Sequence, residues 1–331
     1  MTLLRAGKLS GEVLTRLLAR HAVIGERLVV PPRVGEDAAV IELPDRYLVL
    51  ATDPITFVTE EVGHFVVTVN ANDVATLGAT PLFFSCVLLL PPGSELAQVD
   101  QIFGQVARAC RAHGVAWVGG HTEVSPTVSA PLVVGQMLGE VARDRLVRKE
   151  SLRPGDRLLL TRELAVEAVS IIARLRRDEV REAHGEAFLQ RALGFVHDPG
   201  INVVPEALAA SAAGGVHAMH DPTEGGLAGG LHELAAASGM GLTVRRSLPV
   251  NAETRALCQQ FGLDPLGLIA SGSLLIAVAP ERADAVTAAV TALGTSCTPI
   301  GEVTATPGCR FDGGELVPMF EADEITRLLP G

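Results

Sequence analysis

Hydrophobic and polar residues follow strand-like and helix-like spacings along most of the chain, and the pattern predicts an α/β fold. Two β-rich runs, residues 37–43 and 46–53, flank a short turn and predict a hairpin. A helix is expected over residues 63–79, an apolar strand over 82–90 and a second helix over 95–114. The first part of the chain therefore alternates between strands and helices.

The pattern continues with a strand over residues 115–120, which we expect to enter a glycine-rich loop, and a strand over 130–141. Apolar periodicity lapses over residues 142–156, which favours a domain boundary there and predicts domains over residues 1–150 and 151–331. Beyond the boundary, strands over 157–161, 241–246, 273–280 and 300–305 alternate with helices that begin near Glu163, Val203, Glu224, Ala252 and Glu281. This alternation allows parallel or mixed sheets.

The strand over residues 82–90, with the sequence LFFSCVLLL, is apolar on both faces. Such a strand is usually buried on both sides. A two-fold dimer would bury the second face, and we predict one. A layer of helices from the same chain is the alternative.

Composition narrows the class of protein. The 331 residues exceed the size at which single cores usually stop growing, so two domains are expected. Hydrophobic residues make up 48% of the chain but aromatic residues only 4%, which predicts an interior of Ala, Val, Leu and Ile. The net charge is −11 and lysine occurs only at Lys8 and Lys149, so nucleic acid is not an expected partner.

The cysteines and the apolar runs indicate in which cellular compartment the protein is expected. The five cysteines form no CxxC pair or metal-finger spacing, which favours a reducing environment. The run PLFFSCVLLLPP is too short to cross a bilayer, and residues 8–23 read as an amphipathic helix rather than a signal peptide. We therefore expect a cytoplasmic protein without a membrane segment.

Residues 217–230, HAMHDPTEGGLAGG, allow two interpretations. Asp221 is a candidate N-cap, followed by Pro222 at the first helical position and Glu224 three residues after the cap. Capping leaves the glycines of this stretch unexplained, since glycine inside a helix is destabilising. The second interpretation is a phosphate site at the start of a helix, where free N–H groups attract anions. His217 and His220 lack a third ligand nearby, so zinc is not expected.

Carboxylates and amides recur at the ends of apolar runs. They occur in VGEDAAV (Glu36, Asp37), LATDPIT (Thr52, Asp53), NANDVATLGATP (Asn70, Asn72, Asp73) and HDPTEGG (Asp221, Glu224). Taken singly, most would be caps or turn residues. Asp73 differs, because it falls within an apolar helix. Oxygen ligands of this kind suit Mg²⁺, which commonly bridges carboxylates and substrate phosphates.

The stretch VGGHTEV, residues 118–124, is a second candidate for phosphate binding, because its glycines would let the backbone approach a ligand closely. A plain turn after a strand is the alternative. His121 and Glu123 within it are chemically suited to proton transfer and are our candidate catalytic residues.

Five ordered motifs, GEDAAV, ATD, NDVATLGATP, GGHTEV and MHDPTEGGL, resemble one superfamily. Its members include aminoimidazole ribonucleotide (AIR) synthetase, selenophosphate synthetase, thiamine-monophosphate kinase and the hydrogenase maturation factor HypE. The resemblance covers almost the whole chain. It is closest to the HypE-like branch, through residues 219–242 and 248–268.

The resemblance implies two α/β domains that bind ATP, with the N-terminal domain serving nucleotide binding and pairing into a β-barrel across a homodimer. It implies Mg²⁺ ligands at Asp37, Asp53, Asp73 and Asp221. Expected nucleotide contacts are Gly35, Thr52, Asn72, Gly119, Gly120, Thr122, Thr223, Glu224, Gly225 and Gly226. The implied chemistry is phosphoryl transfer to a carbonyl or amide oxygen, or to a small acceptor.

The sequence departs from the HypE pattern in three places. Members that dehydrate a carbamoylated thiol end in a cysteine tail, whereas this sequence ends ITRLLPG and its last cysteine is Cys309. Their Asn-Glu-Gly corresponds to Ala270-Ser271-Gly272 here, so the glutamate proposed as an acid or base is missing. His121 stands where several relatives carry a metal-binding aspartate.

Three functional hypotheses follow. The first is an ATP- and Mg²⁺-dependent enzyme acting on a small-molecule or protein-borne carbonyl substrate. The second is a nucleotide-binding maturation accessory protein that acts by docking a partner protein. The third is a structural dimer whose acidic residues are caps.

Overall fold

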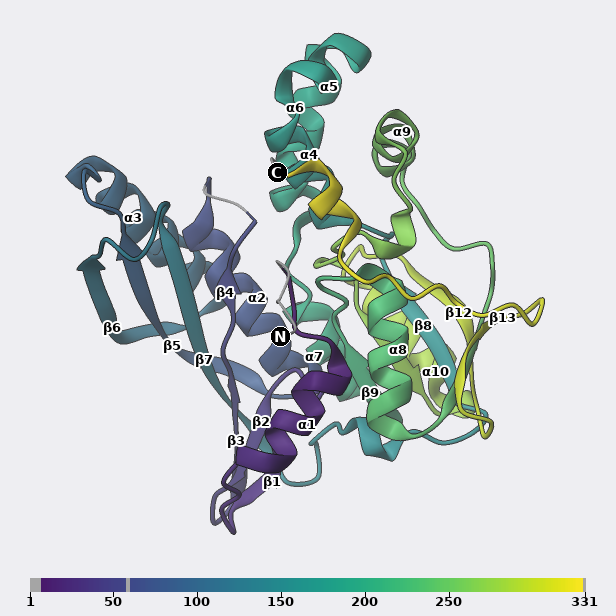
Figure 1. Ribbon diagram of the computed structural model, residues 1–331. Helices are drawn as coiled ribbons and strands as arrows, with labels where there is room; N and C mark the ends of the chain where they lie inside the picture. Colours follow the sequence, from purple (N-terminus) through teal and green to yellow (C-terminus); the bar gives the residue numbers. More distant parts are fainter. Residues whose placement is uncertain (1–6, 58–59, 330–331) are drawn as a thin grey trace. The chain divides into compact units, whose positions relative to one another are not determined.

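The computed structural model describes residues 7–57 and 60–329, which divide into two compact units (Figure 1). The N-terminal unit comprises Gly25–Pro31 and Asp37–Leu146. The C-terminal unit comprises residues 7–24, Pro32–Glu36 and residues 147–329. The motif GEDAAV is therefore divided, with Gly35 and Glu36 in the C-terminal unit and Asp37 in the N-terminal unit.

The N-terminal unit is a seven-stranded mixed sheet packed against two helices. Its strands are β1 (Leu28–Val30), β2 (Ala39–Glu42), β3 (Arg46–Ala51), β4 (Pro54–Ile55), β5 (Thr80–Leu90), β6 (Ala116–Val124) and β7 (Leu132–Ala142). The order is β1-β2-β3-β7-β5-β6, with β4 beside β7. Strands β5 and β6 are parallel and the other pairs antiparallel.

Helix α2 (Val62–Thr76) packs against β3, β5 and β7, and α3 (Leu96–His113) packs against α2. Every residue of α2 except His64 is buried, as expected for a helix that is apolar on all sides. The second half of the helix also buries polar residues, which include Asn70, Asp73 and Thr76. These three residues are spaced three apart, which places them on neighbouring turns of one side of the helix.

The C-terminal unit is built around a six-stranded mixed sheet in the order β13-β10-β12-β8-β11-β9. Its strands are β8 (Arg157–Thr161), β9 (Val216–His220), β10 (Gly241–Val244), β11 (Leu275–Val278), β12 (Cys297–Thr304) and β13 (Gly308–Phe311). Its helices are α1 (Gly11–His21), α4 (Val166–Leu175), α5 (Arg177–His184), α6 (Glu186–Gly194), α7 (Val204–Ala213), α8 (Gly226–Ser238), α9 (Ala252–Phe261) and α10 (Ala283–Thr291).

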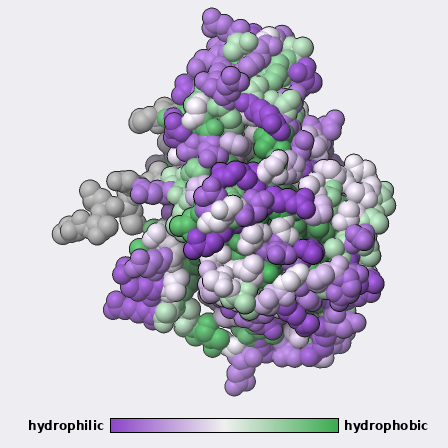
Figure 2. All heavy atoms as spheres, turned by 90° about the vertical axis from the view of Figure 1, so that its right-hand side faces the viewer, coloured by the Kyte–Doolittle hydropathy of each residue, from purple (hydrophilic) through white to green (hydrophobic). Residues whose placement is uncertain are grey.

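Within this unit, α7 and α10 pack on each other and cover β8, β9 and β12, while α8 covers β10 and β13. Helices α4, α5, α6 and α9 pack together beyond one end of the sheet (Figure 1). The face shown in Figure 2 is mainly hydrophilic, with hydrophobic side chains scattered among polar ones.

One end of the six-stranded sheet collects three loops. Leu275, the first residue of β11, pairs with Leu160 near the end of β8 and with His220 at the end of β9. The loops that follow β8 and β9 and the loop that precedes β11 therefore meet at the same end of the sheet. We refer to it below as the strand-end site.

The α/β prediction is confirmed, with both sheets mixed rather than parallel. The hairpin is confirmed as β2 and β3, and residues 63–79 form α2. The amphipathic helix near the start is confirmed as α1, which has no buried residue. Among the described residues, no helix combines the length and apolarity needed to cross a membrane.

Two expectations were wrong. Residues 118–124 are not a loop, because β6 continues through them to Val124 and pairs with β5 along its length. Residues 176–200 lack a distinctive motif in the sequence and would read as loop, but they include α5 and α6. Strands β9 and β13 were not predicted.

The apolar strand β5 is buried on one face only in the single chain. Phe84, Leu88 and Leu90 are buried, whereas Phe83 and Val87 are 42% and 37% exposed. The outward face of β5 is therefore apolar and accessible, which is the condition under which we predicted a dimer.

Candidate functional site

In the N-terminal unit, helix α2 fixes three of the aspartates singled out from the sequence. The side-chain Oδ1 of Asn70 accepts a hydrogen bond from the backbone N–H of Asp53 at 2.9 Å, and its Nδ2 donates to the Asp53 carbonyl at 3.3 Å. This double contact holds the chain between β3 and β4 in place. Asp53 is half-buried and the preceding Thr52 is exposed.

The other two aspartates meet at Thr76. Its hydroxyl donates to Asp37 Oδ2 at 3.1 Å and lies 2.7 Å from the carbonyl oxygen of Asp73. Asp73 is 4% exposed and Asn72 is fully buried. Asp37 precedes β2, so the GEDAAV and NDVATLGATP motifs are brought together at the end of α2.

Strand β6 carries the second group of predicted residues. Gly119, Gly120 and Thr122 lie within the strand and are exposed. A Cβ on Gly120 would lie 1.9 Å from the carbonyl oxygen of Cys86, so close strand pairing accounts for this glycine. His121 Nε2 and Glu123 Oε2 are 3.2 Å apart on the same face of the strand, with side chains 65% and 55% exposed.

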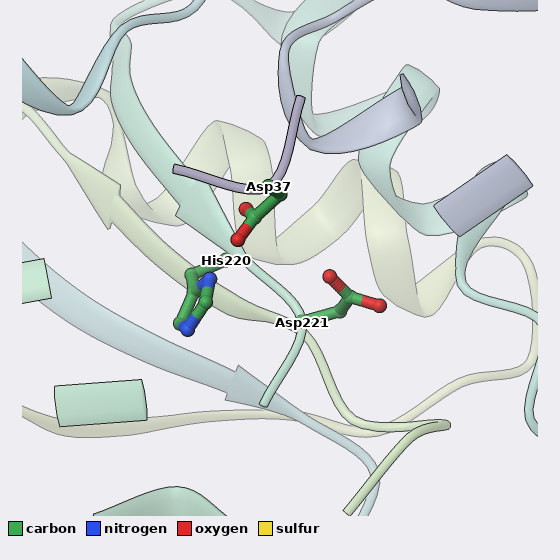
Figure 3. A group of neighbouring side chains, drawn as sticks. All are labelled: Asp37, His220 and Asp221. Carbon is green, nitrogen blue, oxygen red and sulfur yellow. The ribbon is translucent and has the colours of Figure 1, made fainter. Parts of the chain in front are cut away.

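In the C-terminal unit, the capping interpretation of Asp221 is wrong. Helix α8 begins at Gly226, five residues after Asp221, and its N-cap is Gly225 with φ +91°. Asp221 is 1% exposed and follows directly on β9. Its side chain and that of His220 point to different sides of the chain, as expected for consecutive residues of a strand (Figure 3).

The glycines at the start of α8 have a packing role. A Cβ on Gly226 would lie 2.4 Å from the carbonyl oxygen of Leu266, and a Cβ on Gly230 would lie 3.0 Å from the ring of His220. The close approach of these backbones brings the loop of residues 221–225 against the segment before β11. Thr223, Glu224 and Gly225 remain partly exposed in that loop.

His220 is held between two charged residues of the same unit. Its Nδ1 lies 3.0 Å from Lys149 Nζ, and its Nε2 lies 2.9 Å from Glu233 Oε2. An ammonium group only donates, so Nδ1 accepts and Nε2 carries the proton that bonds Glu233. Lys149 also donates to the carbonyl oxygen of Gly35, which fixes the GEDAAV glycine at this site. His217 pairs instead with Asp156 at 2.8 Å, so the two histidines have different partners.

Both lysines of the chain lie at the strand-end site. Lys149 contacts His220, and Lys8 Nζ lies 3.3 Å from Thr223 Oγ1. The backbone N–H of Lys8 also donates to Glu224 Oε1 at 3.4 Å. The sequence uses arginine for nearly all its other positive charges. The sequence shows that lysine is rare but does not indicate where the two lysines lie in the fold.

Two buried carboxyl groups complete the site, and the sequence analysis missed both. Asp323 precedes the short helix η5 (Glu324–Leu328), and its Oδ2 accepts from the backbone N–H of Gly225 at 2.8 Å. Burial raises the pKa of Asp323 to about 6. Glu167 lies in the first turn of α4 and is 5% exposed, and burial raises its pKa to about 7.

A cavity of about 510 Å³ in the C-terminal unit lies elsewhere. Arg157, Arg245 and Glu302 are among its lining residues. Arg157 is the first residue of β8, whereas the strand-end site lies at the other end of that strand. This cavity therefore does not coincide with the residues that the sequence singled out.

Comparison with protein families matches both halves of the chain. Residues 35–141 match the AIR synthase related protein, N-terminal domain, and residues 153–313 match the AIR synthase related protein, C-terminal domain. The chain is 30% identical over 314 residues to the carbamoyl dehydratase HypE of Rhizobium leguminosarum bv. viciae. That alignment covers 89% of this chain and 86% of the relative.

Two solved structures share the fold. One is a chain in the crystal structure of a HypE–HypF complex, at a TM-score of 0.77 and 22% identity, covering 93% of this chain and 99% of that chain. The other is the hydrogenase maturation protein HypE in complex with ATP, at a TM-score of 0.72 and 23% identity, covering 98% of each chain.

Proposed function

The chain belongs to the AIR synthase related family, and from this premise we propose that it is an ATP- and Mg²⁺-dependent enzyme. Its proposed reaction is activation of a carbonyl or amide oxygen, or phosphorylation of a small-metabolite acceptor. Support comes from the relative named carbamoyl dehydratase and from the related HypE that was solved with ATP.

The observation that carries the proposal is the arrangement of the strand-end site. A buried aspartate, Asp221, ends a strand and is followed by a loop whose Thr223 and Gly225 belong to a glycine-rich helix start. Both lysines contact this short stretch. Buried acids beside backbone N–H groups and point-like cations are suited to a metal-bound polyphosphate.

We propose the following roles for the residues singled out from the sequence. Asp37, Asp53 and Asp73 of the N-terminal unit and Asp221 of the C-terminal unit offer only oxygen donors, which fits Mg²⁺. The remaining set would contact nucleotide: Gly35, Thr52, Asn72, Gly119, Gly120, Thr122, Thr223, Glu224, Gly225 and Gly226. Bound Mg²⁺ would neutralise the charge of the phosphates.

The protein's own contribution is positioning and charge stabilisation. Thr223 and the N–H groups near Gly225 would orient a phosphate, and the ammonium of Lys8 would lie beside it. His121 and Glu123 are proposed to transfer protons. Their exposure and mutual contact suit exchange with solvent.

We also propose a division of labour between domains. Residues 1–150 would bind ATP and form the homodimer, and residues 151–331 would be the second α/β domain. The accessible apolar face of β5, with Phe83 and Val87, supports the dimer and a barrel formed with a second copy.

A second candidate is a maturation accessory protein that binds nucleotide and docks a partner. The related chain in the HypE–HypF structure favours this candidate. The last cysteine, Cys309, is 1% exposed within β13, so its thiol is not accessible to a partner protein.

Calorimetry with MgATP tests the proposal. We expect saturable binding by the wild-type protein and a loss of at least tenfold in affinity for Asp221→Asn, because the variant removes a charged oxygen ligand while keeping the side-chain shape. Asp144→Asn, an exposed aspartate in the turn after β7, is the matched control and should bind normally. Absence of MgATP binding by the wild-type protein would rule out both candidates.

Turnover separates the two candidates. The enzyme should release ADP faster when a carbamoylated thiol peptide or another acceptor is added to the protein alone. A docking protein should show no such stimulation.

A further inference from the structure

Glu167 is buried at the strand-end site, and no cation of the described residues is among the groups that shift its pKa. It lies in the first turn of α4, six residues after Thr161 ends β8. The turn between them contains Ala165 at φ +60°, a left-handed conformation that costs energy in a residue with a Cβ. A buried ionised carboxyl also costs energy unless it is paired. Both features call for a reason beyond packing.

The contacts of Glu167 leave one oxygen available. Ser271 acts on this carboxyl through its side chain and its backbone N–H, and both interactions lower the pKa of Glu167. The residues beside the pair are closely packed, since a Cβ on Gly272 would lie 3.3 Å from Val166 Cγ1. The Oε2 of Glu167 has no hydrogen-bond partner among the described residues. Ser271 is itself 1% exposed and lies in the loop just before β11. Oε2 of this buried carboxyl is therefore able to take a proton.

Asp323 connects this pair to the loop after β9. Its carboxylate accepts from the backbone N–H groups of Gly225 and Ile325, each at 2.8 Å. Its negative charge acts on Glu167 and favours the protonated form of that carboxyl. Glu167, Ser271 and Asp323 thus line the region between the Gly225 loop and the start of β11.

The charged groups on the other elements around α4 are directed elsewhere. Those on α5 and on the segment Val196–Gly200 are exposed, apart from the half-buried His184, which contacts Gln260. On α6 and α9, Arg191 pairs with Glu253. The charge that acts on Glu167 is that of Asp323.

A second buried glutamate in the same unit, Glu206, has the contacts expected of a residue that only stabilises the fold. Glu206 is 2% exposed, and its Oε1 pairs with Arg162 at 2.6 Å and with Thr295 at 3.0 Å. An ion pair with arginine accounts for the burial of such a carboxylate. Glu167 has a hydroxyl and a nearby carboxyl in place of the arginine.

We propose that Glu167 acts through Ser271 as the proton acceptor for the substrate, a role that rests on the proposed function above. With an amide acceptor, the carbonyl oxygen bonds to the γ-phosphorus while the bond to the β,γ-bridging oxygen breaks and ADP leaves with its electron pair. The amide N–H proton passes to Ser271 Oγ, and the hydroxyl proton of Ser271 passes to Glu167. Ser271 contacts the acceptor, and Glu167 is a positioning residue that stores the proton.

The test measures ADP release with MgATP and a carbamoylated thiol peptide for wild type, Glu167→Gln, Glu167→Asp and Ser271→Ala. We expect Glu167→Gln and Ser271→Ala to lower kcat about 100-fold, as for loss of a general base, with the Kd for MgATP within twofold of wild type. Glu167→Asp should recover part of kcat. The wild-type kcat should rise through a limb near pH 7 that Glu167→Gln lacks.

Glu206→Gln is the matched control. It should lose stability but keep kcat within about threefold, because Glu206 bonds Arg162 and Thr295 rather than Ser271. Wild-type kcat in Glu167→Gln or Ser271→Ala would overturn the proposal, as would a lowered kcat in Glu167→Gln that keeps the pH limb. Failure of the wild-type protein to bind MgATP would instead refute the proposed function, and this role with it.

Discussion

The chain contains two pairs of acid–base side chains in contrasting surroundings. His121 and Glu123 contact each other on an exposed strand of the N-terminal unit. Glu167 and Ser271 contact each other inside the C-terminal unit, 5% and 1% exposed. Water screens the contact between the first two side chains, whereas burial raises the pKa of Glu167 in the second pair to about 7. A motif in the sequence pointed to the exposed pair, and only the fold reveals the buried one.

The largest expected effect is the change in the protein's unfolding free energy with pH that Glu167 causes. The folded pKa of Glu167 is about 7 and the ordinary value is 4.5, so the folded state keeps a proton that the unfolded state loses between these values. The contribution of Glu167 to the unfolding free energy should therefore be most favourable below about pH 4.5, and it should fall as the pH rises to about 7. The loss should reach roughly 3 kcal/mol for this difference in pKa.

Glu167→Gln removes this titration, because glutamine stays neutral. Urea unfolding between pH 5 and 8 should show a smaller decline of the unfolding free energy in the variant than in the wild-type protein. A constant offset between the two is expected, because the amide loses a good hydrogen-bond geometry. Parallel curves at all pH values would show that Glu167 titrates normally in the folded protein.

The contrast explains how far the sequence could lead. The hairpin β2–β3 and helix α2 followed from spacing alone, because local periodicity determines which face is buried. Residues 118–124 were misread as a loop, since a glycine pair usually ends a strand, whereas here the neighbouring backbone of Cys86 requires Gly120. Helices α5 and α6 were missed because few of their residues are buried, namely Val180 in α5 and Leu189 and Ala192 in α6.

The candidate site divides in the same way. Asp221 and Asp73 stood out because their neighbours in sequence are informative. Glu167, Ser271 and Asp323 are far apart in the chain, and only the pairing of β8, β9 and β11 brings them to one end of a sheet. The missing glutamate at position 271 indicated that an acid or base had to be sought elsewhere. The rarity of lysine was a signal that would have drawn attention to Lys8 and Lys149.

Lys8 provides an intermediate case, since it is exposed yet lies at the buried site. Lys8→Ala should weaken ATP binding about fivefold, roughly 1 kcal/mol, because an exposed ammonium gives a screened attraction. Binding of AMP should change less than that of ATP if the ammonium lies beside the outer phosphates. Calorimetry at two salt concentrations measures both.

Arg20→Ala, at the exposed end of α1, is the control for loss of one positive charge from the N-terminal region. Equal weakening of ATP binding by Arg20→Ala and Lys8→Ala would attribute the effect to net charge rather than to the contact with Thr223. Lys8→Arg should restore part of the affinity, although arginine does not reproduce a compact ammonium.

The smallest effect on stability is expected for the exposed pair. His121→Ala and Glu123→Ala should each change the unfolding free energy by less than about 0.5 kcal/mol, because both side chains are more than half exposed and their pairing is screened. Urea unfolding of the two single variants and the double variant measures this directly. A coupling energy well above 1 kcal/mol in this double-mutant cycle would mean that strand β6 is covered in solution, as it would be in the proposed dimer. The His121–Glu123 pair and Glu167 would then differ in their chemistry rather than in their burial.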